Sequence, residues 1–133
     1  MRNNEPQNKE EKIELTLPVN SAYVSAARLT ASSISNRMGF NIEDIEDIKS
    51  AVSEACIYII NQCSQAGKQN FRIEFMLHNN NLLEIRLTTA LKSTILASCD
   101  EDELGIKMIQ ALMDSLEITF ENGGVGIIMR KQK

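Results

Sequence analysis

The chain of 133 residues contains no tryptophan and one histidine, and aromatic residues make up 5% of it. It also lacks any apolar run near the roughly 18–20 residues that a membrane-spanning helix needs. Residues 1–12 are polar and charged, without the apolar segment of a secretory signal. A net charge of −4 provides no basic surface for nucleic acid. We therefore expect a cytoplasmic protein that binds neither a membrane nor nucleic acid directly.

Cysteine is also scarce, with Cys56, Cys63 and Cys99 as the three examples. An odd number without a C-x-x-C pair indicates neither a disulfide framework nor a zinc site. Cys56 and Cys63 lie seven residues apart on the apolar side of one predicted helix. We expect them to be buried free thiols, and we expect no bound metal.

The remaining composition is that of an ordinary globular protein. Hydrophobic residues make up 43% of the chain, which is enough for one packed core at this length. Residues 1–11 have almost no apolar side chains and predict a disordered arm. Residues 12–133 are expected to form a single domain.

Hydrophobic periodicity predicts five strands and three helices in this domain. Their order, β-α-α-β-β-α-β-β, predicts an α/β fold of the α+β kind, in which three helices pack on one face of a mostly antiparallel sheet as a two-layer sandwich. Strands are predicted over 13–17, 71–77, 82–87, 116–120 and 125–129, and helices from Asn20 or Ser21 to about Met38, from Asn41 to about Ser64, and over about 102–114.

The most informative segment, residues 48–56, reads Ile-Lys-Ser-Ala-Val-Ser-Glu-Ala-Cys. It resembles the start of a nucleotide-binding box in the anti-sigma-factor serine kinases, which belong to the GHKL, or histidine-kinase-like, ATPase superfamily. The resemblance covers roughly residues 12–131 and implies a Bergerat-type ATPase fold. In that family the glutamate is a general base and an asparagine four residues later holds the Mg²⁺ of ATP. Here these positions are Glu54 and Tyr58, and a phenol is a poor ligand for Mg²⁺.

Helix geometry aligns Glu54, Tyr58 and Asn61 along one stripe of the predicted helix, opposite Cys56 and Cys63. Such a stripe is by itself most often a solvated face, but the resemblance implies that it faces the nucleotide. Asn61 lies about one turn beyond Tyr58, so it could hold a metal only if the nucleotide were shifted.

Two further boxes of the family are also altered. Where the family binds adenine with Asp-x-Gly, this chain has Thr89 and Leu91. A threonine hydroxyl brings no charge, and we expect the leucine to enter the adenine pocket and fill it together with Tyr58. Where the family cradles phosphates with a glycine-rich helix start, only Gly105 remains, after acidic residues 100–103 that would repel a triphosphate.

These changes predict a bacterial regulatory protein of the anti-sigma, partner-switching type that has lost ATP binding and kinase activity, with no cofactor. The resemblance implies that its partner is a sigma factor or an anti-anti-sigma-like protein. It also implies that Arg28, expected on the exposed side of the first helix, contacts this partner. Members of the family commonly form homodimers.

Two alternatives stay open. In the first, the chain is a divergent but active serine/threonine kinase that uses ATP with Mg²⁺ and depends on Glu54, Asn61 and Gly105. In the second, it is a small α/β module that binds another ligand in a vacated pocket lined by Tyr58, Leu91 and Ile106.

Overall fold

The computed structural model describes residues 9–63, 69–89, 103–121 and 124–133. These residues form strands and helices in the order that the sequence predicts. No helix in these four ranges is long and apolar enough to cross a membrane. The elements are β1 (Glu10–Pro18), the 3-10 helix η1 (Ser21–Tyr23), α1 (Val24–Met38), α2 (Ile42–Cys63), β2 (Asn70–His78), β3 (Leu82–Thr89), α3 (Glu103–Leu112), β4 (Ser115–Glu121) and β5 (Gly124–Gln132).

The strands form one five-stranded sheet in the order β1-β2-β3-β5-β4. Every pair of neighbours is antiparallel, so the prediction of a mostly antiparallel sheet is confirmed. β3 lies at the centre, while β1 and β4 form the two edges. The register places Ile73 of β2 between Leu15 of β1 and Leu87 of β3, which aligns apolar side chains across the strands.

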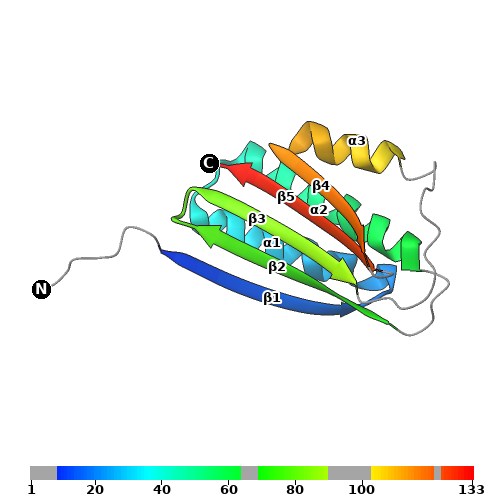
Figure 1. Cartoon of the computed structure of the whole chain (residues 1–133). Coiled ribbons are helices and arrows are strands. Elements are labelled where there is room, and N and C mark those ends of the chain that lie inside the picture. The colour runs from blue at the N-terminus through cyan, green and yellow to red at the C-terminus, as the bar shows by residue number, and fades with distance from the viewer. Residues whose placement is uncertain (1–8, 64–68, 90–102, 122–123) are drawn as a thin grey trace, which may run out of the picture.

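The helices cover one face of this sheet, and no described helix covers the other (Figure 1). α1 packs against α2, and α2 packs in turn against α3. Alternate residues of β2 are buried beneath the helices, which is the expected pattern of a strand with one covered face. The predicted two-layer sandwich is therefore confirmed. The buried residues of β2 are Phe71, Ile73, Phe75 and Leu77.

α2 connects the core of the protein to its candidate site. Asn41 caps the helix, because its Oδ1 accepts a hydrogen bond of 2.8 Å from the backbone N–H of Asp44. Gly39 ends the preceding helix with a φ of +91°, a conformation that glycine adopts without strain. One side of α2 is buried along its length, and its members are Ile48, Ala51, Val52, Ala55, Cys56, Ile59 and Cys63.

The two described cysteines are free and buried, as predicted. Burial raises the pKa of the Cys56 thiol to about 12. This thiol therefore stays protonated at neutral pH and is a poor nucleophile. Cys99 lies outside the described residues.

The start of the fold differs from the prediction. β1 begins at Glu10 rather than at residue 13, so residues 10 and 11 belong to the sheet and not to a disordered arm. Glu10 pairs with His78 of β2. Beyond this pair, Lys9 and Asn79 share two hydrogen bonds of 2.6 and 2.8 Å. Backbone pairing needs no apolar side chain, which is why composition missed it. Residues 1–8 lie outside the described residues.

Candidate functional site

A cleft between α2 and α3 brings together residues that the sequence predicted for one site. Its volume is about 290 Å³. Glu54, Tyr58, Asn61 and Gly105 all line it, although Gly105 comes from a different helix. We call it the α2–α3 cleft, and its lining residues are Glu54, Ile57, Tyr58, Asn61, Leu104, Gly105 and Met108.

The helical repeat explains why α2 presents polar groups here. At about 3.6 residues per turn, Glu54, Tyr58 and Asn61 recur on one stripe while the opposite stripe packs into the core. Asp47 continues this stripe toward the start of the helix, but it does not line the cleft. Its Oδ2 lies 3.8 Å from the Nζ of Lys131. The part of α2 that contributes to the site is therefore its second half.

Gly105 allows the start of α3 to lie directly against Glu54. A Cβ atom at Gly105 would lie only 2.9 Å from Oε1 of Glu54, which is too short for an ordinary contact. Glycine removes this clash because it has no side chain. Since α3 begins at Glu103, the Glu54 carboxylate lies beside the first turn of a helix, where the helix dipole favours a negative charge.

Tyr58 contributes to both the core and the cleft. It is half-buried and packs against the hydrophobic core. It also lines the cleft without closing it, because about 290 Å³ remains open beside it. Leu91, the other residue expected to fill this pocket, lies outside the described residues.

Thr89, predicted to take the place of the adenine-binding aspartate, does not line the cleft. Its Oγ1 accepts a hydrogen bond of 3.2 Å from the backbone N–H of Val125. It also hydrogen-bonds the Cys63 thiol. Burial raises the pKa of this thiol, and the hydrogen bond to Thr89 offsets only part of the rise. Thr89 thus connects the ends of β3, β5 and α2.

Arg28 is half-buried, so its predicted place on the exposed side of α1 is corrected. Its Nη1 donates a hydrogen bond of 2.9 Å to Oγ of Ser53 on α2. The same hydroxyl donates to the backbone carbonyl of Lys49 at 3.0 Å. Because Ser53 immediately precedes Glu54, Arg28 is connected to the turn of α2 that carries the cleft glutamate. The sequence did not indicate Ser53, since this contact depends on how α1 packs on α2.

The rim of the α2–α3 cleft is apolar and exposed. Leu104 is 70% exposed, and Ile57 and Met108 are each 40% exposed. Helical spacing groups Leu104 and Met108 with Ile109, but α3 buries only Ile109 fully in the core. Ile106, which one alternative placed in the pocket, packs partly buried against the core and does not line the cleft.

The cleft offers few ligands for a metal ion. Among the residues that the structure describes, no group of three or more His, Cys, Asp or Glu side chains could hold one. Glu54 supplies a carboxylate and Asn61 an amide oxygen, with Tyr58 between them along the helix. Mg²⁺ requires near-octahedral oxygen ligands, usually carboxylates and phosphates, so this donor set fits it poorly.

Comparison with known proteins identifies the family. The family model of the histidine kinase-like ATPase domain matches residues 17–131. The chain belongs to this family. Its α2–α3 cleft is therefore a feature of a histidine kinase-like ATPase domain, and the predicted membership of the superfamily is confirmed.

The chain is also similar to the serine-protein kinase RsbW of several Bacillus species. It is 34% identical to RsbW of Bacillus cereus and of Bacillus anthracis over 137 aligned positions, covering 91% of this chain and 84% of each relative. RsbW of Bacillus mycoides is 33% identical over the same span. The predicted resemblance to the anti-sigma-factor serine kinases is thus confirmed.

A solved structure supports the same fold. The crystal structure of the RsbU and RsbW domains of a Mycobacterium tuberculosis protein matches 92% of this chain and 32% of that chain, with a TM-score of 0.68. Sequence identity is 16%, so this match speaks for the fold alone.

Proposed function

We propose that this histidine kinase-like ATPase domain is a bacterial anti-sigma-type regulator that binds a partner protein and has lost ATP binding and kinase activity. It would act in the cytoplasm and switch between a sigma factor and an anti-anti-sigma-like protein. The observation that carries the proposal is Tyr58, which lines the α2–α3 cleft one turn after Glu54, where the family has its metal-binding asparagine.

The chemistry of phosphoryl transfer supports the loss of activity. Catalysis of this reaction depends on a positioned triphosphate and on metal ions that neutralise its charge. Tyr58 removes the expected amide ligand, and no cluster of acidic side chains in the described residues replaces it. Without a metal, the carboxylate of Glu54 would repel a triphosphate. A general base alone cannot compensate, since it needs the substrate hydroxyl within hydrogen-bonding distance.

Calorimetric titration with ATP and ADP, with and without Mg²⁺, tests this loss directly. We expect no measurable heat at millimolar nucleotide. A variant that restores the family residues, Tyr58→Asn with Thr89→Asp and Leu91→Gly, should gain Mg²⁺-dependent binding if only the boxes have changed. Micromolar, Mg²⁺-dependent binding by the unaltered chain would overturn the proposal.

Partner binding is tested with Arg28. Its planar guanidinium suits a protein interface, and its hydrogen bond to Ser53 holds it against α2. We expect Arg28→Ala to weaken binding to a sigma factor or anti-anti-sigma protein from the same genome by tenfold or more, in a titration followed by fluorescence anisotropy. Arg37→Ala, which removes the same charge from an exposed position on α1, is the matched control. Failure to bind either class of partner would contradict the proposal.

The assembly is part of the same proposal. Because members of the family commonly form homodimers, we propose a homodimer for this chain as well. Light scattering coupled to size-exclusion chromatography measures its mass in solution, and a monomeric mass at the concentration used for partner binding would contradict this part.

A second candidate is a divergent but active serine/threonine kinase, and one observation favours it. Glu54, Asn61 and Gly105 line the same cavity, as that mechanism requires. Transfer of radiolabelled phosphate from ATP to a serine of the partner, abolished by Glu54→Gln, would establish this function. Absence of transfer with the partner bound would exclude it.

A further inference from the structure

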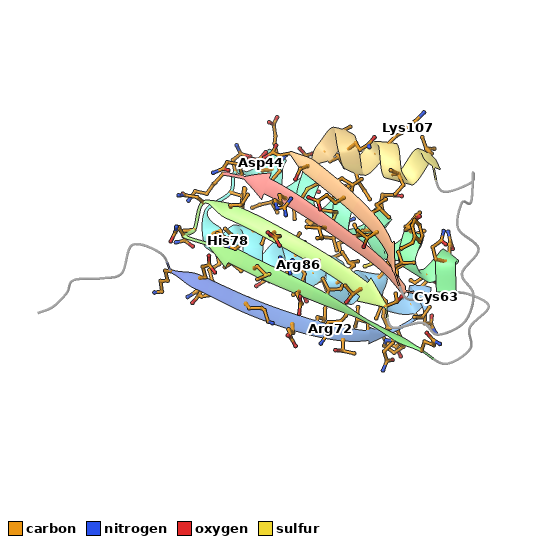
Figure 2. The ribbon with its side chains drawn as sticks, in the orientation of Figure 1. Asp44, Cys63, Arg72, His78, Arg86 and Lys107 are labelled. Carbon is orange, nitrogen blue, oxygen red and sulfur yellow. The ribbon has the colours of Figure 1, made fainter. Side chains whose placement is uncertain are left out.

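The α2–α3 cleft holds an acidic side chain that forms no ion pair with any described residue. Among the described residues that line the cleft, Glu54 is the only acidic or basic one. The ion pairs of α2 lie nearer its start, where they involve other acidic side chains, and none in the described part of the chain includes Glu54. Lys107 belongs to α3, but it lies on the outer side of that helix in Figure 2 and does not line the cleft.

Apolar side chains border the cleft around this carboxylate, while Asn61 and Tyr58 lie on the same stripe of α2 as Glu54. The exposed side chains of Ile57, Leu104 and Met108 form its rim. Grouped, exposed apolar side chains on a soluble domain commonly mark a binding site. The ring of Tyr58 adds an aromatic surface one turn from Glu54. The volume of about 290 Å³ lies at the lower end of ligand pockets, so it suits a small group.

We propose that the α2–α3 cleft binds an alkylammonium group. The nitrogen lies at the carboxylate of Glu54, and the carbon chain lies against Leu104 and Met108. Tyr58 contributes its ring, because the face of an aromatic ring attracts a cation. A free amine and a lysine side chain of a partner protein share this chemistry, so both are sources of the ligand.

Other classes of ligand fit the cleft less well. An anion would be repelled by Glu54. A bare divalent cation would need more oxygen ligands than Glu54 and Asn61 provide. A neutral apolar molecule would displace water from Glu54 without replacing its hydrogen bonds, which is unfavourable for a charged group. Only a cation with an apolar body satisfies both the carboxylate and the rim.

This inference rests on one part of the proposed function, namely that Mg²⁺-bound nucleotide does not occupy the cleft. It is independent of which sigma factor or anti-anti-sigma protein binds at Arg28. A test that includes nucleotide therefore separates the failure of the two proposals.

The test is a titration of the ¹⁵N-labelled full chain, followed by backbone amide shifts at constant ionic strength. The probes are n-butylammonium, Nα-acetyl-lysine N-methylamide, n-butanol, and ADP with Mg²⁺. We expect both cations to shift amides of residues 54–61 and 104–108, and butanol to bind at least about tenfold more weakly, the loss of one charge-assisted hydrogen bond. Tighter binding of the lysine derivative would identify a partner side chain as the source, and tighter binding of butylammonium a free amine.

Two variants with the same change of charge sharpen the result. Glu54→Gln should weaken cation binding by about tenfold, whereas Glu43→Gln, on the exposed first turn of α2, should leave it unchanged. Leu104→Ala provides a second test, because this exposed side chain can be truncated without harm to the core and its loss should weaken binding several-fold.

The outcomes separate clearly. Equal binding of butanol and butylammonium, or unchanged binding by Glu54→Gln, would overturn the cation site. If none of the four ligands binds, the cation site is overturned, but the proposed loss of nucleotide binding is not. Mg²⁺-dependent binding of ADP at the same amides would overturn the proposed function as well.

Discussion

Two glutamates of this fold, Glu84 and Glu54, lie in very different surroundings. Glu84 lies on the open face of the sheet, yet its side chain is only 7% exposed, because the guanidinium groups of Arg86 and Arg130 bond to it. Figure 2 shows Arg86 on this face, opposite the helices. Glu54 lies in the α2–α3 cleft, is half-buried, and has no ion pair within the described part of the chain. One carboxylate is saturated by the protein itself, and the other remains available to a ligand.

The surroundings of Glu84 are those of a structural group. Burial raises its pKa, but hydrogen bonds and charge from Arg86 and Arg130 outweigh burial and lower it overall. Polar contacts continue from Glu84 in both directions across the sheet. They pass through His78 to Glu10 on one side and through Arg130 to Glu117 on the other, so they join all five strands. Such a network stabilises the sheet, whereas an acid such as Glu54, with no ion pair among the described residues, is suited to binding a ligand.

The largest expected effect is on stability, when the charge of Glu84 is removed and the result is compared with removal of the charge of Glu54. Glu84→Gln should lower the free energy of unfolding by about 1–3 kcal/mol, because it leaves two arginines without their shared partner. This expected loss is smaller than the usual cost of breaking a buried ion pair, because the side chains of Arg86 and Arg130 are 42% and 31% exposed. Glu54→Gln should change the free energy of unfolding by less than about 0.5 kcal/mol. Urea unfolding at pH 7 measures the free energy of unfolding of both variants. Equal losses in the two variants would contradict the difference proposed between Glu84 and Glu54.

A smaller effect is expected from pH. The pKa of Glu84 is lower in the folded protein than its ordinary value of 4.5. Its contribution to stability is therefore complete above that value and is lost as the pH falls through the lowered folded pKa. The difference in unfolding free energy between the unaltered chain and Glu84→Gln should therefore shrink as the pH falls below 4.5. A difference that grows below pH 4.5 would contradict this sign.

A small effect on stability is expected at Gly105. In Gly105→Ala the new methyl group would displace the flexible carboxylate of Glu54, while alanine favours the helix, so stability should change by less than about 1 kcal/mol. Carboxyl ¹³C shifts should change for Glu54 and not for Glu84. Gly39→Ala is the control, since its φ of +91° should make alanine destabilising by about 1 kcal/mol while neither carboxyl shift changes. An unchanged Glu54 shift in Gly105→Ala would contradict the close contact.

Local patterns predicted much of this molecule. Alternation along 71–77 and 82–87 predicted two strands, which pair in the sheet. Asn41 was predicted as the start of a helix, where an asparagine side chain can bond a free N–H of the first turn. The spacing of Glu54, Tyr58 and Asn61 predicted a shared face, which lines the α2–α3 cleft. These features depend on residues close together in the chain.

Contacts between distant segments were not predictable in the same way. The bond from Arg28 to Ser53 spans 25 positions and depends on the packing of α1 on α2. The bond from Thr89 to Val125 spans 36 and depends on the placement of β5 beside β3. The exposure of Leu104 also depends on tertiary packing, since a helical repeat does not show which side of a helix meets the core.

The sequence by itself determined the order of the elements, the apolar stripe of α2 and the presence of Tyr58 four residues after Glu54, because these follow from local spacing and side-chain identity. Tertiary structure decided which carboxylate is enclosed and which is not. Antiparallel pairing of β3 with β5 brings Arg130 opposite Glu84. The approach of α3 through Gly105 places Glu54 in an apolar cleft instead of beside a cation. Both outcomes depend on how distant segments pack, which no local pattern encodes.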